Sequence, residues 1–241
     1  MSTRLRLIGA SLATVLVVAS VGFYAWVRTG TYPAFPEATA TAVQAQTERG
    51  WYVFEPKTEP SEGLILYPGG LVDPAAYAPL MRQLADAGVL AIIVPMPLNL
   101  AVFGEARAGD VVAAYPRIDT WVLSGHSLGG AMAAEYMKTS PANIDGVVFL
   151  ASYPSESTDL SALSVPFVSI YGSEDGVAGD VFEESLDRLP LGTSLKSIVG
   201  GNHAQFGDYG PQKGDGIATV SREEQQRQTV DAILDLVRAI E

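Results

Sequence analysis

The chain has 241 residues, 48% of them hydrophobic, and a formal net charge of −12, which suits one substantial core and is short for two full domains. It contains no cysteine and only 2 histidines, so disulfides, thiolate catalysis, cysteine zinc sites and a His-rich metal site are excluded. Every acidic residue follows Arg28, and because this excess of negative charge repels nucleic acid, we expect no nucleic-acid partner.

The N-terminal segment, residues 1–28, contains an uncharged apolar run from Leu7 to Val27, preceded by Arg4 and Arg6. At a helical rise of about 1.5 Å per residue this run spans a hydrocarbon layer of about 30 Å, which predicts one transmembrane helix that binds the membrane as an anchor. A signal peptide cleaved near residues 18–20 is the alternative. Both interpretations place the rest of the chain outside the cytoplasm, either as the extracytoplasmic domain of a single-pass protein of the cell membrane or as a secreted protein.

Residues 29–39 contain Pro33 and Pro36 and no periodic apolar pattern, which predicts a linker. The folded domain is expected to run from residue 40 to residue 241. Residues 41–47 alternate between apolar and polar side chains, and residues 51–54 are mostly apolar. This pattern is typical of a hairpin at the edge of a sheet.

The rest of the chain alternates short apolar runs with amphipathic ones. The predicted strands are residues 64–67, 89–94, 120–123, 146–150, 167–171 and 195–199, and the predicted helices are residues 74–87, 105–115, 131–139, 178–189 and a last one from residue 221. Uninterrupted apolar strands that alternate with helices indicate a parallel sheet covered on both faces. We therefore predict an α/β fold with a mostly parallel, twisted sheet of seven or eight strands.

Ser127 stands in the pentapeptide Gly125-His126-Ser127-Leu128-Gly129, between a predicted strand and the helix that follows it. A tight turn of this kind raises its central side chain above the edge of the sheet. Glycines two residues before and after let strand and helix approach closely. This pattern is the nucleophile elbow, and it predicts Ser127 as a nucleophile.

A serine nucleophile needs a base, which in turn needs an orienting carboxylate. His126 lies inside the elbow, where its backbone direction aims it away from the hydroxyl, so we expect it to be a packing or rim residue. His203 follows the last predicted strand and therefore reaches the edge of the sheet where the elbow lies. His203 is the predicted base.

The predicted acid is Asp175. It lies in the loop that follows the predicted strand at residues 167–171, at that same edge of the sheet, and it precedes Gly176. Glu174 is expected to be a turn residue without a catalytic role. Asp208, five residues after His203, is the reserve candidate.

The oxyanion of a tetrahedral intermediate also needs hydrogen-bond donors. One predicted donor is the backbone N–H of Leu128, directly after the nucleophile at the start of a helix. The second is expected from the loop after residues 64–67. Because Pro68 has no N–H, Gly70 or Leu71 would supply it.

The sequence from about residue 40 onward resembles the α/β-hydrolase superfamily. The resemblance rests on the elbow pentapeptide, on the chain order Ser127, Asp175, His203, and on Tyr67-Pro68-Gly69-Gly70, where many members have a His-Gly oxyanion motif. Residues 201–210 also resemble a compact bacterial subgroup that is loosely likened to dienelactone hydrolases. Those enzymes use a cysteine nucleophile, which this chain lacks, so their reaction is not carried over.

Together these features predict a serine hydrolase that cleaves carboxylic esters or thioesters through an acyl-enzyme, with a small-molecule ester as substrate and without metal or cofactor. Residues 151–165 are too few to build a large lid, which favours small or surface-presented esters. An envelope acyltransferase with the same triad is one alternative. A catalytically silent binding module that retains the fold is another.

Overall fold

The computed structural model describes residues 3–141, 143–179 and 181–240, and for residues 3–13 and 181 it describes the backbone only. The chain divides into two compact units, Met1–Thr31 and Tyr32–Glu241. Each unit is described by itself.

The first unit is the helix α1 (Thr3–Gly30), so the predicted helical conformation of residues 7–27 is observed. Within the part of the chain that the structure describes, no helix is both long and apolar enough to cross a membrane. The membrane-spanning role predicted for this segment is therefore not confirmed. The side chains of residues 7–13 lie outside the described part.

The second unit is built on one eight-stranded sheet with the strand order β1-β2-β4-β3-β5-β6-β7-β8. Strands β3 to β8 are parallel, and β2 is antiparallel to both of its neighbours. The predicted mostly parallel sheet of seven or eight strands is thus confirmed. The strands are β1 (Gln46–Glu48), β2 (Trp51–Phe54), β3 (Glu62–Tyr67), β4 (Leu90–Ile93), β5 (Thr120–His126), β6 (Gly146–Leu150), β7 (Phe167–Gly172) and β8 (Ser194–Ile198).

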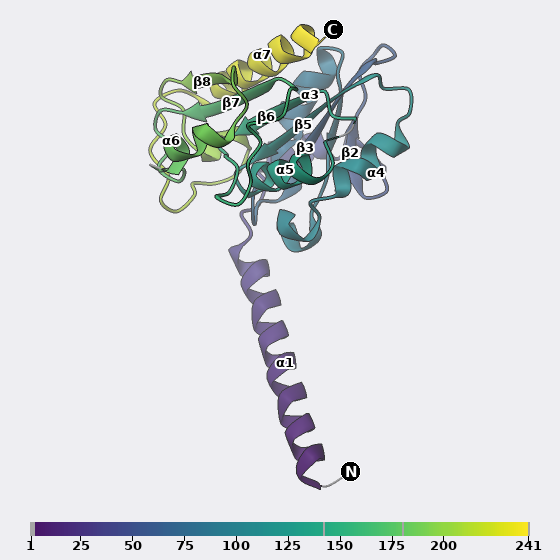
Figure 1. The fold of residues 1–241 in the computed structure, drawn as a ribbon, viewed down its shortest axis with the longest axis vertical. Coiled ribbons are helices and arrows are strands. Elements are labelled where there is room, and N and C mark those ends of the chain that lie inside the picture. Colours follow the sequence, from purple (N-terminus) through teal and green to yellow (C-terminus); the bar gives the residue numbers. More distant parts are fainter. Residues whose placement is uncertain (1–2, 142, 180, 241) are drawn as a thin grey trace. The chain divides into compact units, whose positions relative to one another are not determined.

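Helices cover both faces of this sheet (Figure 1). One apolar core joins the sheet to α3 (Ala78–Asp86) and α7 (Arg222–Ile240), and the other joins it to α4 (Arg107–Ala114) and α5 (Leu128–Thr139). In α3 the predicted helical spacing is realised, because Leu80, Met81 and Leu84 are all buried, and each such burial stabilises the fold by roughly 1.5–3 kcal/mol. The shorter helical segments are α2 (Pro36–Ala42), η1 (Pro74–Tyr77), η2 (Pro97–Asn99), η3 (Ala101–Phe103), α6 (Val181–Ser185), η4 (Leu186–Arg188) and η5 (Ala204–Phe206).

The structure differs from the predicted linker at residues 29–39. Thr29 and Gly30 are the last residues of α1, whereas Tyr32 pairs with Val72 and Ala34 pairs with Tyr209, so the part from Tyr32 onward belongs to the second unit. Helix α2 then begins at Pro36, since a proline in the first turn lacks only an N–H that has no helical partner anyway.

Two further elements differ from the prediction. The alternation of residues 41–47 was compatible with a strand, but its first part completes α2, whose Ala38 and Ala42 are buried one turn apart. Only Gln46–Glu48 is strand. The helix predicted at residues 178–189 is reduced to α6 and η4, and residue 180 lies outside the described part.

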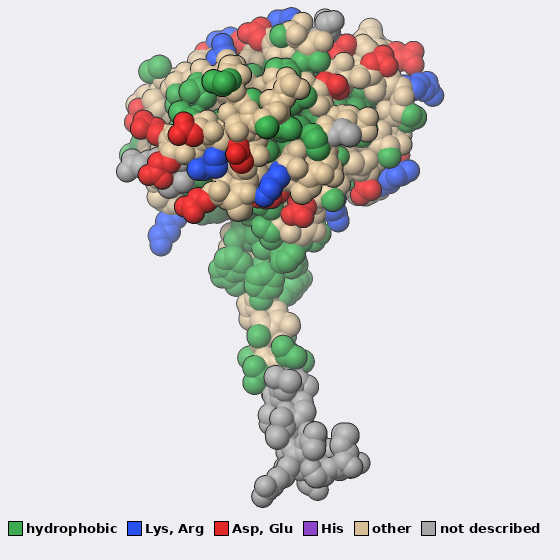
Figure 2. All heavy atoms as spheres, in the orientation of Figure 1, with side chains coloured by type: hydrophobic (Ala, Val, Ile, Leu, Met, Phe, Trp, Pro, Cys, Tyr) green, Lys and Arg blue, Asp and Glu red, His purple; other side chains and the backbone are tan. Residues whose placement is uncertain are grey.

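The negative charge is spread over the surface of the second unit. In the view of Figure 2, acidic side chains lie scattered over the visible face, with basic side chains between them. On α7, for example, Arg227 pairs with both Glu224 and Asp231. This dispersal of charge suits a solvated acidic surface.

Candidate active site

The nucleophile elbow lies between β5 and α5. Ser127 has φ 50° and ψ −123°, a conformation that costs a non-glycine residue free energy and persists only where its surroundings impose it. Here the backbone is fixed on both sides. The Ser127 N–H donates to the Leu150 carbonyl at 3.0 Å, and the Ser152 hydroxyl donates to the Ser127 carbonyl at 2.6 Å.

The glycines of the elbow are required by close approach of the backbone. A Cβ atom on Gly125 would lie 2.5 Å from backbone atoms of Gly129, and one on Gly129 would lie 2.1 Å from the Tyr67 carbonyl oxygen. Both distances are below van der Waals contact. Helix α5 therefore packs directly over β3 and β5, which places Ser127 at the carboxyl edge of the sheet.

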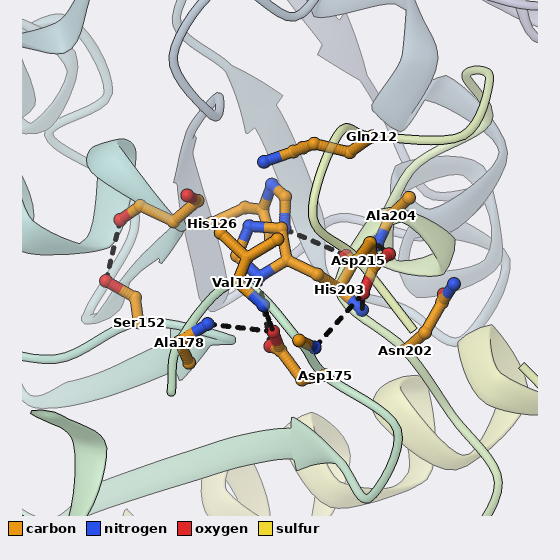
Figure 3. Close-up of polar contacts among 12 residues, drawn as sticks. His126, Ser152, Asp175, Val177, Ala178, Asn202, His203, Ala204, Gln212 and Asp215 are labelled. Carbon is orange, nitrogen blue, oxygen red and sulfur yellow. Dashed lines mark hydrogen bonds and ion pairs between the residues drawn. The ribbon is translucent and has the colours of Figure 1, made fainter. Parts of the chain in front are cut away.

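The predicted base and acid meet at this edge (Figure 3). His203 Nδ1 lies 2.9 Å from Asp175 Oδ2, and both side chains are almost fully buried. The other carboxylate oxygen, Oδ1, accepts from the N–H groups of Val177 at 2.8 Å and Ala178 at 3.0 Å. The Asp175 carboxylate is thus held from both sides, with one oxygen reserved for the imidazole.

Opposing effects act on the pKa of Asp175. Burial raises it, but the hydrogen bond and charge of His203 and the two backbone N–H groups together lower it below its usual value. Asp175 is therefore a carboxylate at neutral pH. An ionised acceptor at Nδ1 keeps the proton of a neutral His203 on Nδ1 and leaves Nε2 free as a proton acceptor.

His203 Nε2 is buried and has no hydrogen-bond partner among the described residues. Ser127 and His203 line the same cleft of about 230 Å³, with Leu128, Ala131, Ala151, Ser152, Tyr153, Val177 and Ala178. A larger hollow, of about 560 Å³, is lined mainly by residues 55–60 and 114–118. It contains neither serine nor histidine, so of these two hollows in the described part of the chain, the smaller cleft is the one that combines a serine with a histidine.

The predicted oxyanion donors lie on two adjacent segments. A Cβ atom on Gly70 would lie 2.9 Å from the Leu128 side chain, so the loop after β3 reaches the start of α5. Among the described residues, neither the Leu128 N–H nor the Gly70 N–H has an acceptor. The Leu71 N–H, by contrast, donates to the Asn99 carbonyl at 2.7 Å. Of the two candidates on this loop, Gly70 is the one with a free donor.

The two other carboxylates considered in the sequence, Asp208 and Glu174, have other hydrogen-bond partners. Asp208 Oδ2 accepts from Gln226 Nε2 at 2.7 Å, and Glu174 is exposed and accepts from the Ser173 hydroxyl at 3.0 Å. Neither has a hydrogen bond to His203.

The sequence reasoning did not single out Asp215. Its carboxylate accepts from the backbone N–H groups of His203 at 3.1 Å and Ala204 at 2.8 Å, so it shapes the loop that carries the base. Asp215 lies in a glycine-rich stretch between Gly214 and Gly216, which looks like any turn. Its role follows only from the three-dimensional contact.

Of the two alternatives predicted for His126, a packing or a rim residue, the structure shows the packing residue. It is fully buried, and both ring nitrogens have partners, the Tyr77 hydroxyl at 2.8 Å and the His203 carbonyl at 3.1 Å. Burial above all, and the neighbouring His203 imidazole, hold its pKa well below the ordinary value of 6.5. His126 is therefore a neutral, hydrogen-bonded residue of the interior.

This burial of His126 predicts a pH dependence of stability. The unfolded chain binds a proton at this imidazole below about pH 6.5, and the folded chain does not, so the free energy of unfolding falls as the pH drops from about 6.5. Between pH 6.5 and 5.5 the loss from this one group is roughly 1 kcal/mol. Urea unfolding of the wild type and of His126→Gln should show a steeper loss for the wild type, and equal slopes would contradict the assignment.

The arrangement has the parts that acyl transfer needs: a strained serine, a base with an open acceptor, a fixed carboxylate and two free N–H donors. Among the described residues no cluster of His, Asp and Glu side chains has the form of a metal site.

Comparisons with known proteins are consistent with this geometry. The sequence profile described as "Alpha/beta hydrolase family" matches residues 63–227, which is more than half of the chain. A search of the curated proteins returns no match.

Among solved structures, the chain is similar to the esterase Est2 of the Planctomycetes species Thermogutta terrifontis, with 15% identity, a TM-score of 0.54, and coverage of 78% of this chain and 89% of that chain. The structure of that esterase phosphoramylated by tabun matches with 14% identity, a TM-score of 0.56, and coverage of 79% and 92%. MenH from S. aureus matches with 12% identity, a TM-score of 0.59, and coverage of 80% and 99%. At these identities the likeness shows a shared fold.

Proposed function

Because the chain belongs to the alpha/beta hydrolase family, we propose that it is a serine hydrolase that cleaves carboxylic esters or thioesters through an acyl-enzyme intermediate. The observation that carries this proposal is that His203, whose buried Nε2 has no hydrogen-bond partner among the described residues, lines the same cleft as Ser127, while its Nδ1 is engaged by Asp175. A buried ring nitrogen without a partner costs free energy. A base that must accept a proton from its substrate or nucleophile accounts for that cost.

In the proposed reaction, Ser127 Oγ attacks the substrate carbonyl carbon and His203 Nε2 takes the hydroxyl proton. The imidazolium that forms is stabilised by the Asp175 carboxylate. His203 then gives the proton to the leaving alcohol or thiol as the C–O or C–S bond breaks. Water repeats the sequence on the acyl-enzyme and releases the acid.

The oxyanion of each tetrahedral intermediate would be bound by the N–H groups of Leu128 and Gly70. Leu128 is the first residue of α5, so the positive end of the helix dipole adds to its donor. The Asn99 carbonyl accepts a hydrogen bond from the Leu71 N–H, and this bond helps to hold the loop that contains Gly70 beside α5. Preorganised donors of this kind are worth about 10²–10³ in rate each.

The structural neighbours support a serine nucleophile. The Thermogutta esterase is phosphoramylated by tabun, and an organophosphorus ester of this kind reacts with an activated nucleophile. The corresponding experiment is incubation of the full-length chain with a fluorophosphonate probe and with a short p-nitrophenyl ester. Covalent labelling and release of p-nitrophenol support the proposal, whereas a chain inert to both would refute it.

The size of the cleft predicts the acyl preference. The segment between β6 and β7, residues 151–166, contains no helix or strand, so it builds no lid, and the cleft of about 230 Å³ is lined largely by small and apolar side chains. Hydrolysis of p-nitrophenyl acetate should therefore be faster than hydrolysis of the palmitoyl ester, measured as kcat/KM below the micelle concentration of the longer ester. Faster cleavage of the palmitoyl ester would contradict an open, short-chain site.

A further inference from the structure

A buried chain of hydrogen bonds runs beneath the candidate active site. The Gly69 N–H donates to the Tyr77 hydroxyl at 2.9 Å. Tyr77 Oη lies 2.8 Å from His126 Nδ1, and His126 Nε2 lies 3.1 Å from the His203 carbonyl oxygen. Tyr77 and His126 are both fully buried.

The partners at the two ends fix the direction of every bond. The His203 carbonyl oxygen can only accept, so His126 Nε2 carries the proton. Because the buried ring is neutral, its Nδ1 is an acceptor, and Tyr77 must donate to it. The Tyr77 oxygen then accepts from Gly69. Burial raises the pKa of Tyr77 well above its usual value, so its hydroxyl keeps the proton that it donates.

The two ends of this series of hydrogen bonds belong to different parts of the site. Gly69 precedes Gly70, the free donor of the loop after β3. His126 precedes Ser127 in the elbow, and the accepting carbonyl belongs to the base, His203, itself. We propose that Tyr77 and His126 are positioning residues. They hold the Gly70 N–H donor and the His203 base at the correct positions relative to the Ser127 nucleophile. This inference rests on the proposed hydrolase function.

Packing supports a fixed geometry for this pair. The His126 ring lies 4.7 Å from the His203 ring, centroid to centroid, and 5.8 Å from that of Phe206. Figure 3 shows the His126 ring beside His203. A Cβ atom on Gly69 would lie 2.7 Å from His126 Nδ1 and 2.9 Å from Tyr77 Oη. Only glycine lets the loop after β3 come close enough to join the chain of bonds.

Four variants of the full-length protein test separately the bond from Gly69 to Tyr77 and the bond from His126 to the His203 carbonyl. Tyr77→Phe removes the hydroxyl and leaves Gly69 without its acceptor. His126→Gln places an amide donor near the position of Nε2 and so keeps a bond to the His203 carbonyl. His126→Asn places an acceptor near Nδ1 and loses that bond. Tyr209→Phe is the matched control, because it removes a hydroxyl from another buried tyrosine, one that bonds Gln212 instead.

The expected result is a loss of kcat with KM nearly unchanged. Tyr77→Phe should lower kcat about tenfold, the effect of one lost hydrogen bond, without changing the pH profile of kcat/KM. His126→Asn should lower kcat and also shift the acidic side of the pH profile of kcat/KM. His126→Gln should leave the acidic side of that profile as it is in the wild type. Tyr209→Phe should keep kcat within about twofold. Equal kcat in all variants, or an equal loss in Tyr209→Phe and Tyr77→Phe, would overturn the proposal.

Ring ¹⁵N NMR tests the network independently of activity, since the chain has only 2 histidines. His126 should show the Nε2–H tautomer without titration from pH 5 to 9, unchanged in Ser127→Ala and shifted in Tyr77→Phe. An Nδ1–H tautomer, or a signal insensitive to Tyr77→Phe, would overturn the network even in a variant that fails to turn over. A wild-type chain that shows these signals but cleaves no ester would refute the hydrolase proposal and leave the hydrogen-bond network established.

Discussion

Replacing Ser127 with alanine is expected to lower ester hydrolysis by about 10⁴-fold or more and to abolish labelling by a fluorophosphonate. Alanine keeps the Cβ atom and so keeps the backbone conformation of the elbow, at φ 50° and ψ −123°. The donors of Leu128 and Gly70 also stay in place. The loss therefore reports the nucleophile alone, and it is measured as kcat/KM on a p-nitrophenyl ester and as intact mass after labelling.

Ser152→Ala is the matched control for this nucleophile. Ser152 lines the same cleft, but its hydroxyl donates to the Ser127 carbonyl and is committed to the elbow. The variant should still be labelled, and peptide mass mapping should place the label on Ser127. A label that survives Ser127→Ala, or one that maps to Ser152, would show that the nucleophile has been assigned to the wrong residue.

The elbow could be predicted from sequence because its requirements are local. Gly125 is required by a contact within the same strand–turn–helix unit, with the backbone of Gly129, so the pentapeptide contains much of the information, whereas Gly129 is required by the approach of the Tyr67 carbonyl on β3. The placement of Asp175 and His203 depended on one longer-range rule, that parallel strands end at a common edge. That rule holds here, because β7 and β8 are parallel neighbours, and the loops that follow them bring the two side chains within 2.9 Å.

The features that sequence reasoning missed depend on contacts between distant segments. Tyr77 and His126 are 49 positions apart, and His126 and His203 are 77 positions apart. In the sequence, Tyr77 is one apolar residue of an amphipathic run, so helical spacing explains it fully. The strand order also had to be known before Tyr77, at the end of η1, could be placed beside His126 of the elbow. The use of the Leu71 N–H by Asn99 is equally invisible without the fold.

Asp175→Asn is expected to lower kcat/KM by about 10⁴-fold through the tautomer of His203. In the wild type, Asp175 Oδ1 accepts from two backbone N–H groups, those of Val177 and Ala178. The amide oxygen of an asparagine must take this place, because an NH₂ group there would face two donors. The NH₂ group then points at His203 Nδ1, which becomes an acceptor. The proton moves to Nε2, and the nitrogen that should accept the Ser127 proton already carries one.

The matched control for this substitution is Glu174→Gln, which removes an adjacent carboxylate with no hydrogen bond to His203. Its kcat/KM should stay within about threefold of wild type. Ring ¹⁵N shifts provide a second measurement, because His203 should change from the Nδ1–H to the Nε2–H tautomer in Asp175→Asn at high pH. An Asp175→Asn enzyme with wild-type activity, or one whose His203 keeps its proton on Nδ1, would contradict the assigned role. The alternative would then be a base oriented chiefly by its backbone, through Asp215.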